Sequence, residues 1–183
     1  MARAGRRKII KNMFTLILVG VLSVTLIASV CFATSKKIGP EKEIKTNTIY
    51  LDNLLLERIN WLRKSNGLNE LELNPTLNSY AAIRAAEAST KWSHTRPNGA
   101  QGCNMIPSTK WRGENLSYVV YLNFDFSEEQ QIEIADTMFS NLVNSPAHYE
   151  NMVFSQFTRI GIRTQITQTE KGTRLTTAYM FSN

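Results

Sequence analysis

The feature that constrains this chain most is an uncharged, mostly apolar run of 21 residues, Met13 to Ala33, which follows five Lys or Arg residues. A basic N-terminus ahead of an apolar segment is the pattern of an export signal. As a helix, the run is also long enough to cross the ~30 Å hydrocarbon core of a bilayer. Basic residues ahead of it keep the N-terminus cytoplasmic. The sequence therefore predicts an extracytoplasmic protein, either secreted or anchored to the membrane by residues 1–33.

Three fates of this segment are open. Cys31 and Ala33 are small residues at the two positions that a signal peptidase site requires, which predicts cleavage after Ala33. Retention of the whole run predicts a membrane anchor instead. A lipoprotein signal that ends at Cys31 ranks third, because Val30 is a poor residue to precede a lipidated cysteine.

The charge of the exported part argues against nucleic acid as a partner. The formal net charge is +6, but five of the 21 basic residues and none of the 15 acidic residues lie in the first 33 positions. Sixteen basic residues therefore face 15 acidic residues in the remainder. A basic balance of this origin indicates membrane targeting, not a nucleic-acid footprint.

The exported part has the size of one domain. Residues 34–183 number 150, which is enough for a single hydrophobic core. The polar stretch 34–47 contains Gly39-Pro40 and is predicted to be a linker, so the domain is predicted to span residues 48–183. Cys103 is the only cysteine after position 33, so no disulfide forms within the cleaved chain, and we interpret it as an ordinary loop or core thiol.

Helical periodicity and capping signals predict four helices. The first begins near Thr48 and ends at Asn66-Gly67. Asn74-Pro75 opens the second, which ends before His94. A capping-box pattern at Ser127 opens the third, and Ser145-Pro146 opens a short fourth. The buried faces are predicted to consist of Leu51, Leu54, Leu55, Ile59 and Leu62; of Leu77, Ala81, Arg84, Ala85 and Ala88; and of Ile132, Ala135, Phe139 and Leu142.

Alternating periodicity predicts three antiparallel strands. Residues 160–166 and 175–181 alternate apolar and polar side chains on either side of Glu170-Lys171-Gly172, which predicts a hairpin. A third strand is predicted at 114–120, and the helices are expected to cover both faces of this small sheet. Between the second helix and this strand, residues 93–113 carry turn residues, and an irregular segment of this length is often functional.

Three residues are candidates for chemistry. The chain has only two histidines, His94 just after a helix end and His148 at the third position of the fourth helix, where the helix dipole disfavours an imidazolium. Glu114 lies where Gly113 leads into a strand. Two histidines and one glutamate are a plausible ligand set for a divalent ion such as zinc. The alternatives are that His148 serves only in a capping turn and that Glu114 pairs with Arg112 or another surface cation.

At these residues the sequence resembles a known family. WLRKSNGLNELELNPTLNSYAAIRAAE, SHTRPNG, GENL, NSPAHYENMV and FTRIGIR, in this order, are similar to the CAP superfamily of cysteine-rich secretory, antigen 5 and pathogenesis-related (SCP-like) proteins, in its cysteine-poor bacterial branch. The resemblance covers residues 48–183. It implies an α+β fold, an α-β-α sandwich with a three-stranded antiparallel sheet covered by about four helices, and a surface cleft with two His and two Glu. By motif, His94, Glu114 and His148 are three of these, while the second glutamate is missing and Asn144 and Ser145 are expected on that side.

The resemblance implies two functions of different classes. The favoured one is a secreted or cell-surface binding module whose cleft holds a divalent cation and whose partner is a small ligand, a lipid or an extracellular protein. The alternative is a metal-dependent hydrolase, a peptidase or esterase, in which a metal-bound water attacks a carbonyl while Glu114 accepts a proton. Ser93 beside His94 is a weak candidate nucleophile, since adjacent side chains point apart.

Overall fold

The computed structural model describes residues 47–107 and 110–183. The predicted export segment 1–33 lies outside the described residues, as does the linker up to residue 46. Within the described ranges, no helix is both long enough and apolar enough to cross a bilayer.

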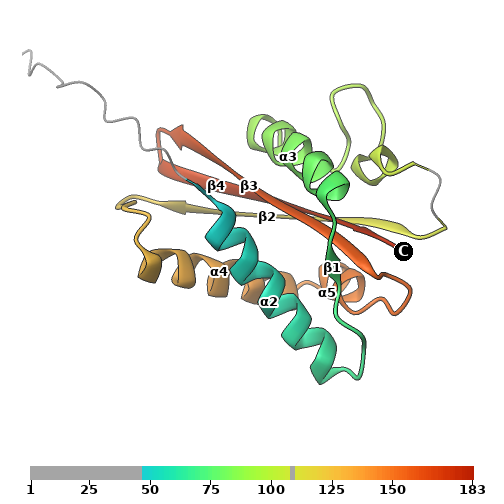
Figure 1. The fold of residues 1–183 in the computed structure, drawn as a ribbon. Helices are drawn as coiled ribbons and strands as arrows, with labels where there is room; N and C mark the ends of the chain where they lie inside the picture. The colour runs from blue at the N-terminus through green and yellow to red at the C-terminus, as the bar shows by residue number, and fades with distance from the viewer. Residues whose placement is uncertain (1–46, 108–109) are drawn as a thin grey trace, which may run out of the picture. The chain divides into compact units, whose positions relative to one another are not determined.

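The domain has three layers, as predicted. A sheet lies in the middle, with α3 (Pro75–Thr90) over one face. The other face is covered by α2 (Ile49–Ser65), α4 (Glu128–Val143) and α5 (Pro146–Met152) (Figure 1). The predicted α+β sandwich with four helices is therefore confirmed.

The sheet has four strands in the order β1-β3-β4-β2, not the three that were predicted. The hairpin β3 (Arg159–Thr169) and β4 (Gly172–Ser182) and the strand β2 (Arg112–Tyr121) form the expected antiparallel part. The additional strand is β1 (Glu72–Leu73), which pairs in parallel with β3. Two residues are too few to show a periodicity, so this strand had no sequence signal.

The ends of the helices follow the predicted caps. The Asn74 side chain accepts a hydrogen bond of 3.0 Å from Leu77 N, with Pro75 at the first helical position of α3. Ser127 Oγ accepts a hydrogen bond of 3.2 Å from Gln130 N at the start of α4. Gly67, with φ +71°, adopts the left-handed conformation just after α2.

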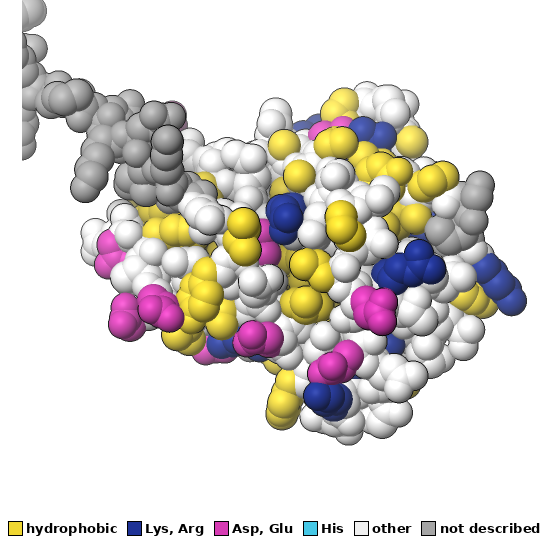
Figure 2. Space-filling view, viewed as in Figure 1, with side chains coloured by type: hydrophobic (Ala, Val, Ile, Leu, Met, Phe, Trp, Pro, Cys, Tyr) yellow, Lys and Arg dark blue, Asp and Glu magenta, His cyan; other side chains and the backbone are white. Residues whose placement is uncertain are grey.

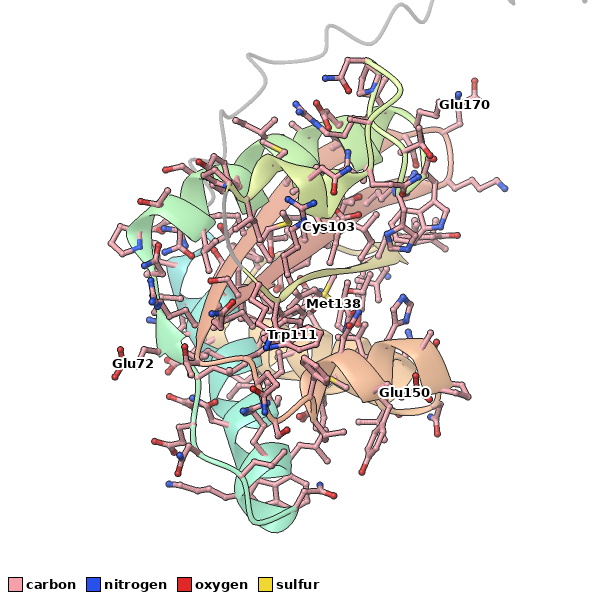
Figure 3. The ribbon with its side chains drawn as sticks, turned by 90° about the vertical axis from the view of Figure 1, so that its right-hand side faces the viewer. Glu72, Cys103, Trp111, Met138, Glu150 and Glu170 are labelled. Carbon is pink, nitrogen blue, oxygen red and sulfur yellow. The ribbon has the colours of Figure 1, made fainter. Side chains whose placement is uncertain are left out.

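The core is divided by the sheet into two unequal parts. The larger part lies between the sheet and α2, α4 and α5, and the smaller part lies under α3. In α4 the buried face differs from the prediction: Ile134 and Met138 join Ala135 and Leu142, while Ile132 is 38% exposed. Figure 3 shows Met138 on the α4 side of the sheet and Cys103 in the 3-10 helix η1 (Gly102–Met105) on the α3 side.

The smaller part of the core permits a very close approach of α3 to the sheet. Ala81, Ala85 and Ala88 on α3 lie against Ala178 and other small or medium side chains of the sheet. At Gly161 on β3 a Cβ atom would lie only 2.1 Å from the carbonyl carbon of Leu77. A glycine is required there because the helix backbone itself touches the strand.

The outer surface carries both signs of charge. In the view of Figure 2, acidic, basic and hydrophobic side chains are interspersed over the face formed by α2 and α4. This distribution agrees with the near-neutral balance of residues 34–183 and offers no single-sign surface for a polyanion on this face.

Asp52 is a buried carboxyl group on α2. Its oxygens accept hydrogen bonds from Thr164 Oγ1 (2.8 Å) and Thr48 Oγ1 (3.3 Å), and Arg163 Nη1 lies 3.4 Å away. Burial outweighs these contacts and raises the pKa of Asp52 from 3.8 to about 6. The folded state therefore binds a proton more tightly than the unfolded chain does.

The raised pKa of Asp52 predicts how stability varies with pH. Its contribution to folding is present below about pH 4 and is lost as the pH rises through about 6, a change of up to about 3 kcal/mol. We expect Asp52→Asn to remove most of this dependence, measured as the free energy of unfolding in urea at pH 4 and pH 7.5. An unchanged pH dependence in the variant would show that other groups are responsible.

Candidate functional site

The first part of the candidate site is a contact between His94 and Glu114. His94 lies in the loop after α3, and Glu114 lies near the start of β2 on the face that α3 covers. His94 Nδ1 is 2.8 Å from Glu114 Oε1. The carboxylate side chain is only 3% exposed, whereas the imidazole is 52% exposed. Since the carboxylate accepts, Nδ1 is the protonated nitrogen, and Nε2 of the neutral ring keeps a free lone pair.

Arg84 neutralises the buried carboxylate. This arginine is on α3 and is 1% exposed. Its Nε donates to Glu114 Oε2 at 2.6 Å, and its Nη2 donates to Oε1 at 3.3 Å. Glu114 is thus paired with a cation of α3 and not with Arg112, whose Nη1 donates to the Ile106 carbonyl. The helical pattern predicted Arg84 to be buried, but only the fold shows what it pairs with.

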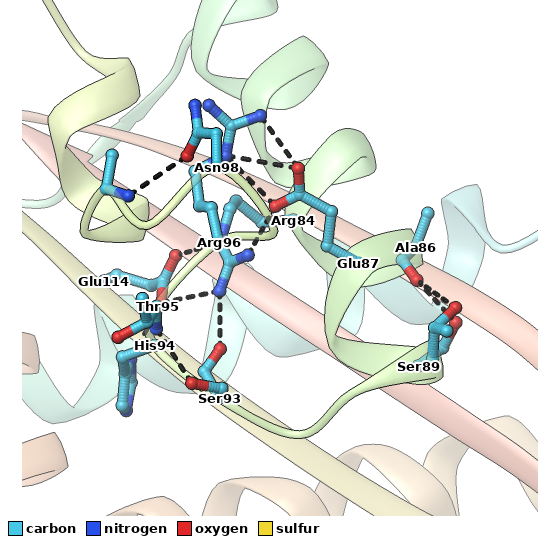
Figure 4. Close-up of polar contacts among 12 residues, drawn as sticks. Arg84, Ala86, Glu87, Ser89, Ser93, His94, Thr95, Arg96, Asn98 and Glu114 are labelled. Atoms are coloured by element: carbon cyan, nitrogen blue, oxygen red, sulfur yellow. Dashed lines mark hydrogen bonds and ion pairs between the residues drawn. The ribbon is translucent and has the colours of Figure 1, made fainter.

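The pair belongs to a longer chain of charges that fixes the loop (Figure 4). Arg84 Nη1 donates to Glu87 Oε2 at 2.5 Å, and Arg96 Nη2 donates to Glu87 Oε1 at 2.8 Å. The hydrogen bonds from Arg96, and then those from Arg84, lower the pKa of Glu87. Arg84 Nη2 also donates to the Ser93 carbonyl at 2.8 Å. These contacts hold both sides of His94 against the end of α3.

Gly102 packs against the ion pair of Arg84 and Glu114 and against the backbone of His94. Its N donates to the His94 carbonyl at 2.8 Å. A Cβ atom at this position would lie 1.9 Å from Glu114 Oε2 and 2.5 Å from Arg84 Nε. The η1 backbone therefore covers the buried ion pair directly, and only a glycine fits.

His148 approaches His94 from the other layer. It is the third residue of α5, and the two imidazole centroids lie 6.4 Å apart with an angle of 49° between the rings. Burial, and secondarily the nearby His94, lower the pKa of His148. The imidazole is therefore neutral near pH 7. The two histidines thus meet across a sequence gap, as predicted.

Asn115 positions His148, which the sequence did not reveal. Its Nδ2 donates to the His148 carbonyl at 2.9 Å, and its Oδ1 accepts from Asn151 Nδ2 at 2.8 Å. Because successive strand residues point to opposite faces, Glu114 faces α3 while Asn115 faces α5. The alternation of side chains along a strand could have predicted this role, because it places Asn115 on the face opposite to Glu114.

The arrangement brings two imidazoles together, with the Glu114 carboxylate behind one of them. Within residues 47–107 and 110–183, no group of three or more His, Cys, Asp or Glu side chains is arranged to hold a metal ion. Both Glu114 oxygens already accept from Arg84 and His94. Two imidazoles on one tetrahedral zinc, with Zn–N near 2.1 Å, have centroids about 5 Å apart, so the rings would close by about 1 Å. A carboxylate behind a ligating imidazole is a common supporting partner.

Asn144 and Ser145, which were expected on one side of the site, lie between α4 and α5. Asn144 Nδ2 donates to Ser140 Oγ at 3.4 Å. Their place beside the imidazoles stays a prediction.

Comparison with known proteins identifies the family. Residues 56–179 match CAP, the cysteine-rich secretory protein family. The chain belongs to the CAP family. No curated protein sequence matches that of this chain.

Solved CAP structures share the fold at low sequence identity. An outer surface protein of Borrelia burgdorferi is 20% identical with a TM-score of 0.57, over 75% of this chain and 96% of that protein. An extracellular protein with an SCP domain from Bacillus anthracis is 16% identical (TM-score 0.53), over 73% of this chain and 40% of that one. A cysteine-rich secretory protein of Staphylococcus aureus is 20% identical (TM-score 0.51), over 76% and 40%. This CAP chain therefore spans less than half of the latter two.

The close cover over the ion pair predicts a large effect of Gly102→Ala. The methyl group would displace either Glu114 or Arg84, and we expect a loss of about 2–4 kcal/mol in the free energy of unfolding. Gly67→Ala is the control, because nothing lies within 4 Å of its Cβ position. It should cost about 1 kcal/mol for its left-handed backbone alone. Equal losses in the two variants would contradict the steric argument.

The environment of His148 predicts its titration. We expect the imidazole of His148 to titrate below 6.5 in a pH series of NMR spectra. His94→Gln should move the pKa of His148 part of the way back towards 6.5, because burial, the larger cause, remains. A His148 pKa above 6.5 would contradict the proposed burial of the neutral ring.

Proposed function

We propose that this CAP protein is an exported binding module in which His94 and His148 hold a divalent cation such as zinc. The single observation that supports it most is the approach of the two imidazoles, one from each side of the sheet, to a centroid distance of 6.4 Å.

An extracytoplasmic location has two independent supports. The basic and apolar pattern of residues 1–33 is that of an export segment. The structurally similar proteins include an outer surface protein and an extracellular protein. Anchoring by the N-terminal segment, and a small ligand, a lipid or an extracellular protein as partner, remain part of this proposal.

The proposed roles of the three residues differ. Neutral imidazoles are the usual nitrogen ligands of zinc, and the lowered pKa of His148 keeps that ring deprotonated near neutral pH. Glu114 acts as a positioning residue, since its hydrogen bond with Nδ1 directs the other nitrogen of His94 outward. A bound cation supplies a positive charge and open coordination positions to a ligand.

The contacts of Glu114 favour binding over hydrolysis. In the hydrolase alternative this carboxylate would accept a proton from water, but it is buried and both oxygens accept hydrogen bonds from Arg84 and His94. Ser93 Oγ accepts a hydrogen bond from Thr95 N at 3.0 Å and belongs to the turn of the loop. No observation favours the hydrolase, so we propose binding alone.

Thermal melting of the full chain with zinc chloride tests the proposal. Zinc at about 100 times its dissociation constant should stabilise the fold by about 2.7 kcal/mol, a rise of several degrees in Tm. His148→Ala should abolish most of this shift. The shift should also fade as the pH falls below the histidine range, because protons compete for the same nitrogens.

Glu150→Gln is the matched control. Glu150 is an exposed carboxylate on the same short helix as His148 (Figure 3), so its loss tests non-specific zinc binding to α5. We expect this variant to keep the full zinc shift. Equal shifts in wild type and His148→Ala, or no shift in wild type, would refute the cation site.

A further inference from the structure

The face of the sheet that α3 covers continues beyond the end of this helix. There, two cross-strand rows of side chains remain. One row pairs Val120 of β2 and Thr167 of β3 with Arg174 of β4, and the next pairs Tyr118 with Thr176. We call Trp92, Tyr118, Val120 and Arg174 the Arg174 patch.

The patch is aromatic and partly exposed. Trp92 follows the end of α3, and its ring packs edge-on against Tyr118 with centroids 4.8 Å apart. Arg174 Cζ lies 4.2 Å from the centroid of Tyr118 and 5.6 Å from that of Trp92. Trp92 and Tyr118 are nevertheless 45% exposed as residues, and Val120 is 40% exposed. A cation is thus held between aromatic rings at the surface.

The guanidinium has a buried donor edge without an acceptor. Among the described residues, Arg174 Nε and Nη2 are buried and have no hydrogen-bond partner. The neighbouring hydroxyls Thr167 Oγ1 and Thr176 Oγ1 are also buried without a partner, and Thr176 is 0% exposed. Four unpaired polar atoms on the same stretch of sheet are uncommon in a folded domain, where buried donors normally find acceptors.

Arg84 shows which acceptor fits this edge. The same two nitrogens of Arg84, Nε and Nη2, donate to the two oxygens of the Glu114 carboxylate at 2.6 and 3.3 Å. A planar carboxylate matches the fork of an arginine, and the resulting hydrogen bonds are charge-assisted. The Nε and Nη2 donors of Arg84 are therefore paired with a carboxylate of the chain itself. The same two donors of Arg174 have no acceptor among the described residues.

We propose that the Arg174 patch binds a monocarboxylate that carries an apolar group. The carboxylate of the ligand accepts hydrogen bonds from Nε and Nη2 of Arg174, and the hydroxyls of Thr167 and Thr176 supply further donors. A single guanidinium balances one negative charge, which favours a monocarboxylate over a doubly charged phosphate. The apolar group of the ligand lies against Tyr118 and Val120. This site does not depend on the cation proposed for His94 and His148.

Because Nε and Nη2 of Arg174 are buried, the proposal requires that a neighbouring side chain moves when the ligand binds. The candidate is Trp92, whose ring centroid lies 5.6 Å from Arg174 Cζ. Trp92 lies outside α3 and is 45% exposed, so its ring turns without breaking a helix. Binding therefore changes the surroundings of Trp92, which gives an optical signal.

Calorimetric titration of the full chain with phenylacetate tests the proposal, and tryptophan fluorescence reports the same event. N-acetylphenylalanine represents the C-terminus of a peptide. Tighter binding of N-acetylphenylalanine than of phenylacetate would indicate a peptide as the source of the carboxylate, and the reverse order would indicate a free acid. Phenylacetamide, which has the same shape without the charge, should bind about tenfold more weakly or not at all. Arg174→Met should weaken phenylacetate binding by about tenfold or more.

Two controls separate binding from folding. Lys171→Gln removes a positive charge from the adjacent hairpin turn and should leave the affinity unchanged. Arg174→Met should change the Tm of the free protein only slightly, because the loss of two unpaired buried donors offsets the loss of the contacts with Tyr118 and Trp92. Absence of saturable binding, equal affinity for phenylacetate and phenylacetamide, or unaltered affinity in Arg174→Met would each overturn the proposal. A fall of many degrees in the Tm of that variant would assign Arg174 to the stability of the sheet instead.

Discussion

The buried ion pair between Arg84 and Glu114 is the interaction on which the rest of the site depends. It joins α3 to β2 below the loop that carries His94. A buried charge pair is tolerated only when its remaining donors and acceptors are satisfied. Here Glu87, the Ser93 carbonyl and His94 complete the hydrogen bonds. The hydrogen bonds of Arg84 and Glu114 with the loop therefore hold it in place, and these bonds set the position of His94.

Glu114 and Asn115 are adjacent on β2, and each contacts one of the two histidines from its own face of the sheet. Glu114 orients His94 on the α3 side, and Asn115 holds the backbone of His148 on the α5 side. The pleat of one strand thus sets the separation of two side chains that are 54 positions apart in the sequence. A displacement of β2 would move both imidazoles together.

The sequence predicted those features that have a local physical cause. Caps at Asn74 and Ser127, helical spacing and strand alternation gave every long element, because each depends on neighbours in the chain. What was missed depends on distant contacts: the two-residue strand β1, the partner of Glu114 and the role of Asn115. For the same reason the sequence could not show that the oxygens of Glu114, a predicted metal ligand, accept from Arg84 and His94.

The lone thiol after position 33 affects where this protein can fold. Cys103 lies in η1 and forms no bond to sulfur, so no part of the fold in residues 47–107 and 110–183 requires an oxidant. Cohesion comes from packed side chains and the satisfied charges around Arg84. The domain should therefore withstand reducing agents that dismantle secreted domains of similar size held by disulfides.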